Sequence, residues 1–291
     1  MLIYVLSRGP KLYSTKRIVQ AGIRSRHNMR VIDHLECDLI IENGEFKIIY
    51  EHEELLRPDF VIPRIGSSVT AYGCTVLRHF EQMGVPVLNS STGIMNSRDK
   101  FRSIQALAQH KIRIPKTYFS FDLYYAERVV REHLGYPFIL KVLEGTQGKG
   151  VYLVSDQDNA FNLFSEHLKK NQKVILQEFI SEFQGRDIRI IVVGNEVVAS
   201  FMRIAKEGDF RSNIHAGGRG EVVPLSEQEK EMAVKATKVL GLQMAGVDIL
   251  RSSNGPMIIE VNSSPGIEGI EGVTKEKIAE KLIQHIENSF S

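Results

Sequence analysis

Short apolar runs alternate with amphipathic stretches along the first part of the chain. The apolar runs predict buried strands at residues 2–6, 29–34, 60–66 and 85–89. The stretches between them predict a basic helix that ends near residue 27 and a second helix over 70–83, and residues 38–50 predict a hairpin that turns at Glu42-Asn43-Gly44. Strands that alternate with helices are typical of a parallel α/β sheet, so we expect one such domain over residues 1–95.

The rest of the chain has a less regular pattern. A helix over 97–110, apolar runs on either side of a glycine-rich segment, and a helix over 157–169 predict a central α+β unit spanning residues 96–183. Residues 184–291 predict a meandering β unit. Its elements are a hairpin turning at Gly194-Asn195, a helix over 226–240, a hairpin over 246–262 and a helix over 274–289. No long linker separates the units, so we expect them to pack closely.

Composition and charge exclude several classes of protein. The chain has 291 residues, 43% of them hydrophobic and 25% charged, which is ordinary for a globular protein. Its net charge of +2 gives no support to direct nucleic-acid binding. No apolar stretch approaches the roughly 18 residues that span a bilayer. Cys37 and Cys74 form no metal-binding pattern, and together with the lack of a signal-peptide pattern they predict a reduced, cytoplasmic protein without membrane contact.

The first thirty residues carry bases and no acid. The bases are Arg8, Lys11, Lys16, Arg17, Arg24, Arg26 and Arg30. Two interpretations stay open at this point. The stretch is either a hydrated helix face or a docking surface for an acidic partner.

The stretch IIEVNSSPG, residues 258–266, places a carboxylate and an amide at the end of an apolar strand. If residues 253–255 form a three-residue loop with the glycine in the left-handed region, Asp248 lies opposite Glu260. Asn262 then follows on the same face. Like charges opposite one another destabilise a sheet, and nothing nearby in the sequence neutralises them. The pattern therefore predicts a site for a hard divalent cation; the alternative is a face on which both acids are hydrated.

Other segments are suited to phosphate. Residues 144–150, EGTQGKG, form a glycine-rich loop whose backbone N–H groups can bind phosphate, although a plain hairpin turn is the alternative. Lys141 lies in the apolar run before this loop, and a lysine in such a run needs a partner such as phosphate. Residues 209–218, DFRSNIHAGG, contribute Arg211, whose guanidinium matches phosphate oxygens.

Two strand segments complete the set. The strand end QEFI, residues 177–180, offers backbone groups to a flat base. Asp187 and Arg189 share one face of the strand that follows. Each of these residues alone is typical of a protein surface, and it is their combination with the two acids of the hairpin that indicates function.

Together these segments resemble the ATP-grasp superfamily, and more closely its RimK branch of glutamate ligases. The resemblance rests on KVLEGTQGKGV, QEFI, GRDIRIIVVG, AKEGDFRSNIHAGG, AGVDIL and IIEVNSSPGIEGIE, and on LSRGPKLYSTKR and FVIPRIG for the N-terminal domain. It covers nearly the whole chain. It implies an ATP-grasp fold of mixed α/β and α+β class, in which a flavodoxin-like, parallel-sheet pre-ATP-grasp domain (1–95) precedes two lobes that grip ATP (96–183 and 184–291).

The resemblance also implies roles for individual residues. The ATP contacts fall on Lys100, Lys141, Gly148, Gly150, Glu178, Phe179, Asp187, Arg211, Ser212 and Asn213. Asp248, Glu260 and Asn262 are the implied ligands of two Mg²⁺ or Mn²⁺ ions. Arg211 is in addition the implied catalytic residue, which stabilises charge on the transferring phosphoryl group.

The implied activity is ATP-dependent ligation of glutamate. A carboxylate attacks the γ-phosphate of ATP to give an acyl phosphate, and the amine of L-glutamate then displaces phosphate. The implied acceptor is the C-terminal tail of a small-subunit ribosomal protein, and the implied assembly is a homotetramer. Ligases that modify small cofactors or make poly-α-glutamate are the alternative. A non-catalytic ATP-binding protein is disfavoured because Asp248, Glu260, Asn262 and Arg211 are all present.

The sequence departs from the branch's pattern at two positions. Lys149 stands in the glycine-rich loop where an apolar residue is expected. Ala216 follows His215 where an arginine is expected before the glycine pair, so Arg219 is the candidate substitute for a carboxylate contact. The second departure bears on which amino acid the protein adds.

Overall fold

The N-terminal unit is built on a parallel sheet, as the alternation of strands and helices predicts. The computed structural model describes residues 1–143, 150–168, 170, 172–206 and 218–290. Strands β1 (Leu2–Leu6), β2 (Asn28–Ile32) and β6 (Phe60–Pro63) form a sheet in the order β2-β1-β6 with both pairs parallel. The predicted strand over 85–89 is wrong, because only Val87 bridges to Val61 before the chain turns into the next helix.

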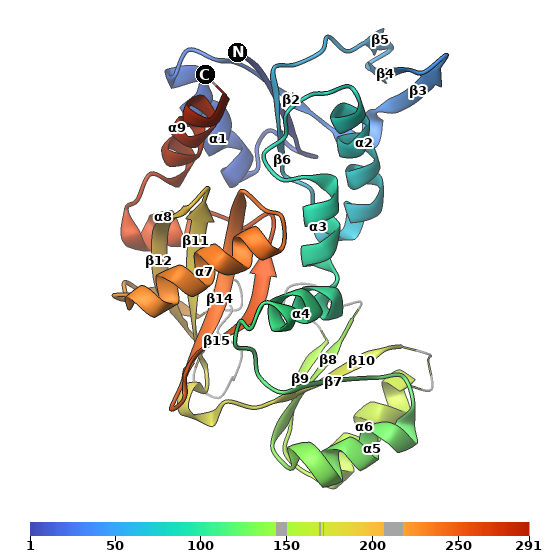
Figure 1. Ribbon diagram of the computed structural model, residues 1–291, viewed down its shortest axis with the longest axis vertical. Helices are drawn as coiled ribbons and strands as arrows, with labels where there is room; N and C mark the ends of the chain where they lie inside the picture. Colours follow the sequence, from blue (N-terminus) through green and yellow to red (C-terminus); the bar gives the residue numbers. More distant parts are fainter. Residues whose placement is uncertain (144–149, 169, 171, 207–217, 291) are drawn as a thin grey trace.

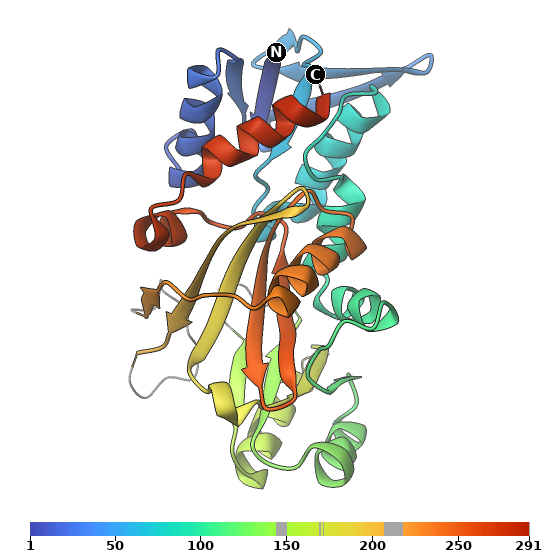
Figure 2. The same cartoon turned by 60° about the vertical axis from the view of Figure 1, so that its left-hand side comes forward.

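Helices cover both faces of this sheet (Figures 1 and 2). Ile3 and Val5 point toward α1 (Tyr13–Arg24) and the C-terminal helix α9 (Ile278–Phe290), and Tyr4 and Leu6 point toward α2 (Thr70–Gln82). One hydrophobic core therefore joins the first and the last segments of the chain. We propose the boundaries near residues 95 and 183 as divisions of the chain, with this core connecting the first and third units.

A small antiparallel sheet extends from the N-terminal unit (Figure 1). It consists of β3 (Asp38–Glu42), β4 (Glu45–Tyr50) and β5 (Glu53–Glu54). Its first turn places Asn43 and Gly44 at φ of 52° and 84°, the left-handed values that a two-residue hairpin turn requires. The hairpin predicted over 38–50 is confirmed.

The helix predicted over 97–110 is two helices. Helix α3 (Ser91–Arg98) ends at Asp99, and α4 (Lys100–Gln109) begins there because the Asp99 carboxylate accepts hydrogen bonds from the first free N–H groups of α4, those of Phe101 and Arg102. The break reorients the chain where it leaves the N-terminal unit. It also fixes Lys100 at the first position of α4, beside the central lobe.

The central lobe is a four-stranded antiparallel sheet with helices on one face (Figure 1). Its elements are β7 (Thr117–Ser120), α5 (Leu123–Val129), a π-helical turn (Val130–Leu134), β8 (Phe138–Val142), β9 (Val151–Val154), α6 (Gln157–Leu168) and β10 (Val174–Glu178), with strand order β7-β10-β8-β9. Phe138, Leu140 and Val142 pack into the core under the helices. Lys141, one position out of step with them, lies on the opposite face.

The C-terminal lobe is a five-stranded antiparallel sheet. It contains β11 (Arg186–Val193), β12 (Glu196–Ile204), β13 (Arg219–Glu221), β14 (Met244–Ser252) and β15 (Gly255–Asn262), with α7 (Glu227–Val239) and α8 (Glu268–Thr274). The strand order is β13-β12-β11-β14-β15. Helix α7 covers one face through a core that includes Ile188, Ile190 and Val247. The residues between them in sequence lie on the other face, where the polar side chains gather.

The basic N-terminal stretch is partly neutralised inside the molecule. Arg17 pairs with Glu271 and Glu280 at 3.2 and 3.3 Å, and Arg24 pairs with Glu280 at 2.8 Å. These acids come from α8 and α9, more than 250 residues away in sequence. A hydrated helix face is therefore the wrong interpretation for Arg17, whereas Arg24 is exposed as well as paired; both join α1 to the C-terminal helices.

Candidate functional site

The two acids of the C-terminal hairpin lie opposite each other, as the sequence predicts, but by a different route. The loop has two residues and not three, because Ser252 pairs with Gly255, whose φ is +105°. With this pairing alone, the two acids would be offset by one position. A β-bulge between Asp248 and Ile249 shifts the register by one residue, so Asp248 faces Glu260 and Gly246 faces Asn262.

Asp248 is neutralised by two arginines from neighbouring strands, which lie 45 and 59 positions away in the sequence. Arg189 on β11 donates to both carboxylate oxygens, at 2.7 and 2.6 Å, and Arg203 on β12 donates to Oδ2 at 2.7 Å. Asp248 is 2% exposed. Burial raises the pKa of Asp248, but the charges and hydrogen bonds of the two arginines outweigh it and hold that pKa below its usual value.

Asp187 belongs to the same network. Its carboxylate accepts two hydrogen bonds from Arg203, at 2.5 and 2.7 Å, and its side chain is buried. Burial lowers the pKa of Arg203, and the charges of Asp248 and Asp187 overcome this and raise it well above the ordinary value. The pairing gives Asp187 a structural role that the sequence did not predict. Its contact with ribose stays a prediction.

Glu260 lies toward the central lobe, among cations that the sequence predicted to bind phosphate. Its side chain is exposed, and its charge acts on Lys100, Lys141 and Arg98. Burial, partly offset by Glu260, lowers the pKa of Lys141 to about 8. Lys100 donates to the carbonyl of Val142 at 3.2 Å, which places its ammonium beside the strand of Lys141. The fold thus brings the predicted phosphate lysines and the hairpin together.

The predicted adenine residues lie at the end of β10. The Glu178 carboxylate accepts from the backbone N–H of Lys116 at 3.2 Å, and the Glu178 N–H donates to the Lys116 carbonyl at 2.9 Å. Phe179 follows directly, half-buried. A strand end over QEFI is confirmed, and the contact of these residues with a base stays a prediction.

Several predicted residues lie outside the described part of the chain. They are Gly148, Lys149, Arg211, Ser212, Asn213, His215 and Ala216. Gly150 is described: it has φ +81°, and its carbonyl accepts from the N–H of Val142 at 2.8 Å, where β8 pairs with β9. Arg219 is exposed on β13 and pairs with Glu221 at 3.2 Å. Its proposed substitution for the expected arginine stays a prediction.

Asn89 is a positioning residue that sequence reasoning missed. Its amide donates to the carbonyls of Met244 and Ser263 at 2.8 and 2.9 Å, and its oxygen accepts from the N–H groups of Gln243 and Met244 at 2.8 and 3.0 Å. The side chain is 1% exposed. It fastens the N-terminal unit to both strands of the hairpin at their site end. The only sequence signal is an amide that closes the apolar run VPVLN.

Gly246 allows the chain after the hairpin to return across the sheet. A Cβ at this position would lie 2.8 Å from the Cβ of Pro265, closer than real side chains approach. Pro265 therefore packs over the glycine that faces Asn262. Its carbonyl accepts from Arg64 at 2.7 Å, which brings a cation of the N-terminal unit to the site.

The donor set of the hairpin suits a divalent cation only in part. Among the described residues, Oδ1 of Asp248 accepts one hydrogen bond and Oδ2 accepts two, so Oδ1 keeps a lone pair for a metal ion. Asn262 Oδ1 accepts from the N–H of Ser264 at 2.9 Å and also keeps one. In the described part of the chain no three His, Cys, Asp or Glu side chains gather closely enough to hold a metal ion. The site therefore fits an ion whose coordination is completed by ligand oxygens or water.

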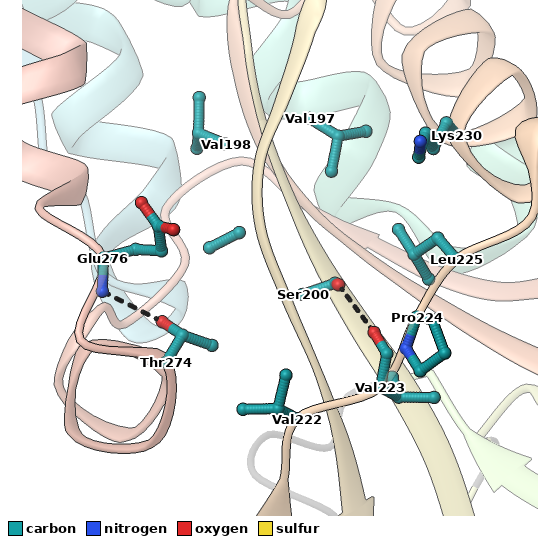
Figure 3. Close-up of a pocket in the computed structure, with 11 residues that line it drawn as sticks. Val197, Val198, Ser200, Val222, Val223, Pro224, Leu225, Lys230, Thr274 and Glu276 are labelled. Atoms are coloured by element: carbon teal, nitrogen blue, oxygen red, sulfur yellow. Dashed lines mark hydrogen bonds between the residues drawn. The ribbon is translucent and has the colours of Figure 1, made fainter.

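A hollow of about 300 Å³ lies between β12 and the segment that follows β13 (Figure 3). Four of its eleven lining residues are valines, and Lys230 and Glu276 also line it. Ser200 Oγ donates to the carbonyl of Val223 at 3.3 Å across it. This hollow contains none of the predicted site residues.

The fold and the site define an ATP-grasp enzyme. A model of the RimK-like ATP-grasp domain matches residues 97–286, and a model of the RimK PreATP-grasp domain matches residues 1–94. The chain belongs to the RimK-like ATP-grasp family, and it is an ATP-dependent ligase that joins an acid to an amino acid.

Relatives and solved structures agree with this assignment. Probable alpha-L-glutamate ligases of Vibrio vulnificus (strain YJ016) and Pseudomonas putida (strain GB-1) are each 47% identical over 289 residues, 99% of this chain and 96% of the relative. The ATP-grasp ligase PsnB, complexed with a minimal precursor, has a TM-score of 0.77 at 20% identity and covers 100% of this chain and 98% of its own. D-alanine–D-alanine ligase from Bacillus anthracis, complexed with ATP, has a TM-score of 0.69 at 19% identity, with 100% and 97% covered. These two structures support the fold.

The described part of the chain contains no helix with the length and apolarity needed to cross a membrane.

Proposed function

We propose that this protein adds glutamate to the C-terminal carboxylate of a ribosomal protein of the small subunit, through an acyl phosphate. The curated relatives support glutamate, since each is named a probable alpha-L-glutamate ligase at about half identity over nearly the full chain. The observation that supports the chemistry most directly is the position of Glu260. Its charge acts on Lys100 and Lys141, and a nucleoside triphosphate needs cations and metal ligands together.

The residues of the chain divide the work by charge. Lys100 and Lys141 bind the nucleotide phosphates as point charges in a site that is poor in water, where each contact is strong. Asp248, Glu260 and Asn262 hold divalent cations, magnesium or manganese, which neutralise the phosphates and keep the reacting groups in line. Arg211 stabilises charge on the transferred phosphoryl group and then on the tetrahedral oxyanion. Glu178 and Phe179 position the adenine, and Asp187 the ribose.

The chemistry of ligation requires proton loss from the amine of glutamate and none from the acceptor. The acceptor carboxylate reacts in its ionised form, so no protein base is needed for its attack on the γ-phosphate. The amine of glutamate must lose a proton to attack the acyl carbon, and phosphate leaves as the amide forms. Positioning and charge stabilisation therefore do most of the work in this mechanism. The glycine-rich loop, Gly148 and Gly150 included, is proposed to close over the nucleotide and exclude water.

The test is amino-acid-dependent phosphate release. The purified protein is incubated with ATP, Mg²⁺ and each amino acid in turn, with and without a peptide that carries the C-terminal residues of a small-subunit ribosomal protein. Phosphate release is measured, and the products are examined by mass spectrometry. Phosphate release that requires glutamate, together with peptide mass increments of glutamyl residues, supports the proposal. Formation of free glutamate polymers, or modification of only an added small cofactor, would show that the acceptor is not a ribosomal protein. Release with no amino-acid dependence would overturn the proposal.

A further inference from the structure

A cavity of about 310 Å³ lies on the polar face of the C-terminal sheet, under the N-terminal unit. The first turn of α1 forms one wall through Tyr13 and Ser14, and Arg64, after β6, forms another. Arg189 and Arg203 line the sheet side, so the cavity shares two residues with the Asp248 network. Its volume is at the lower end of the roughly 300–1,000 Å³ that small-molecule pockets occupy.

Among the arginines of this cavity, Arg64 has no acid partner in the described part of the chain. Arg189 and Arg203 are occupied by Asp248 and Asp187. The hydrogen bond of Arg64 goes to the neutral carbonyl of Pro265 at 2.7 Å. Burial, together with the nearby charge of Arg98, lowers the pKa of Arg64 to about 10. A half-buried guanidinium beside a second cation is stabilised by an anion, and the cavity is where such an anion has room.

The cavity also has an acidic wall residue. Glu268 is the only acid among its described lining residues, it is exposed, and its charge raises the pKa of Tyr13, whose increase comes mainly from burial. A pocket for a phosphate or another plain anion gains nothing from a carboxylate. A pocket for an amino acid does, because the ammonium group needs a negative partner while a carboxylate binds arginine. The lining therefore favours a zwitterionic ligand with an additional negative charge.

We propose that this cavity binds the amino acid that the enzyme adds, with Arg64 receiving its side-chain carboxylate and Glu268 its ammonium group. The assignment rests on the proposed ligase function and specifies the site of its second substrate. It also accounts for the place of the cavity, since Arg189 and Arg203 of its wall pair with Asp248, one of the proposed metal ligands. Selection of an acidic amino acid then depends on a residue of the N-terminal unit and not on the loop where Ala216 departs from the family pattern.

The experiment compares glutamate with glutamine as amine donors for full-length protein at saturating ATP, Mg²⁺ and acceptor peptide. Glutamine differs only in lacking the side-chain charge. Arg64→Gln is expected to raise the KM for glutamate about 10- to 100-fold, the effect of a lost charge-assisted contact, with little change in the KM for glutamine or for ATP. Arg78→Gln, at an exposed arginine of the same unit, is the matched control and is expected to leave all three values unchanged.

Glu268→Gln is the second variant, at an exposed position where folding is not at risk. It is expected to raise the KM for glutamate and for glutamine by a similar factor, because both carry the ammonium group. An unchanged ratio of kcat/KM for glutamate over glutamine in Arg64→Gln would overturn the proposal, and so would unchanged KM values in Glu268→Gln. If wild-type protein releases no phosphate with glutamate, the ligase function fails instead, so the two failures are distinguishable.

Discussion

The C-terminal lobe and the central lobe hold their cations in opposite ways. In the C-terminal lobe Arg189 and Arg203 are bound to Asp248 and Asp187 through short hydrogen bonds. In the central lobe burial lowers the pKa of Lys100 and Lys141, and Lys100 donates to backbone carbonyls. Arginine suits fixed, forked pairing, whereas lysine is a compact charge that any phosphate can meet.

The difference separates scaffold from binding site. A cation that is paired within the protein stabilises the fold and keeps an acid in position. A cation held in a dry place without full compensation destabilises the free protein and becomes favourable only when an anion arrives. Glu260 connects the two groups of charges. It faces Asp248 across the hairpin, and its charge partly offsets the lowering of the pKa of both lysines. Four predictions test this division.

The largest effect is expected at Glu260. Glu260→Gln removes the charge that metal binding requires and keeps the shape, so ligation is expected to fall by at least about 10³-fold. Because Glu260 is exposed, the variant is expected to fold normally. The measurements are glutamate-dependent phosphate release and thermal unfolding. Glu196→Gln, an exposed acid in the same sheet, is the control. Near-normal turnover in Glu260→Gln would exclude the metal assignment.

The next effect is on stability. Arg203→Met leaves Asp187 without its bidentate partner and weakens the compensation of buried Asp248, so the free energy of unfolding is expected to fall by about 3–5 kcal/mol. Urea unfolding measures it. Arg219→Met breaks the exposed pair with Glu221 and is expected to cost less than about 1 kcal/mol. Equal losses in the two variants would show that Arg203 is not part of the scaffold.

Replacing Lys141 is expected to weaken ATP binding but to stabilise the protein without nucleotide. Lys141→Met should weaken ATP binding by about 10- to 100-fold, measured by calorimetry, because a charged contact to phosphate is lost. Lys173→Met, at an exposed lysine of the same lobe, is the control. Without nucleotide at pH 7, Lys141→Met is expected to be more stable than wild type, since it removes a charge from a site that disfavours it.

The difference in stability between Lys141→Met and the wild type is expected to depend on pH. The pKa of Lys141 is about 8 in the folded protein and its ordinary value is 10.5, so the unfolded chain binds more protons between these values. The stability of the wild type therefore rises with pH across this window and is lost again as pH falls through 8. The stability advantage of Lys141→Met should shrink from pH 7 to pH 10. An advantage that does not change with pH would contradict the lowered pKa.

The smallest effect is expected in the basic N-terminal stretch. Arg17 and Arg24 are paired, but the structure assigns no acid partner in its described residues to exposed Arg8 and Lys11, whose neighbours Ser7 and Leu12 line the cavity. We expect these two bases to attract an acidic acceptor tail as glutamates accumulate. The double variant Arg8→Ser, Lys11→Ser should slow long acidic acceptors severalfold at low salt and leave short acceptors unchanged. Equal salt dependence for long and short acceptors in wild type would argue against this role.

Much of the fold follows from local pattern. The parallel N-terminal sheet, the hairpins that turn at Asn43-Gly44 and Gly194-Asn195, and the capping box of α7 at Ser226 are all readable because hydrophobic period and turn chemistry act over a few residues. The split between α3 and α4 at Asp99 was also present in the sequence as an N-cap signal, but the prediction placed one helix across it.

The register of the final hairpin shows where local rules end. The sequence predicts that Asp248 faces Glu260, and the structure agrees, although the loop is one residue shorter and a bulge compensates. A pattern of alternating residues contains neither this bulge nor the close packing of Pro265 over Gly246.

By itself, the sequence determined which residue types are available and on which strand faces they lie, because side-chain alternation is a local property. Only the tertiary structure decided how those charges are divided. It placed Arg203 of β12 beside Asp187 and Asp248, brought Asn89 and Arg64 of the N-terminal unit to the end of the hairpin, and set Glu260 toward the lysines of another lobe. The physical reason is that electrostatic compensation depends on distance in space, and these partners lie between 16 and 201 positions apart in the chain.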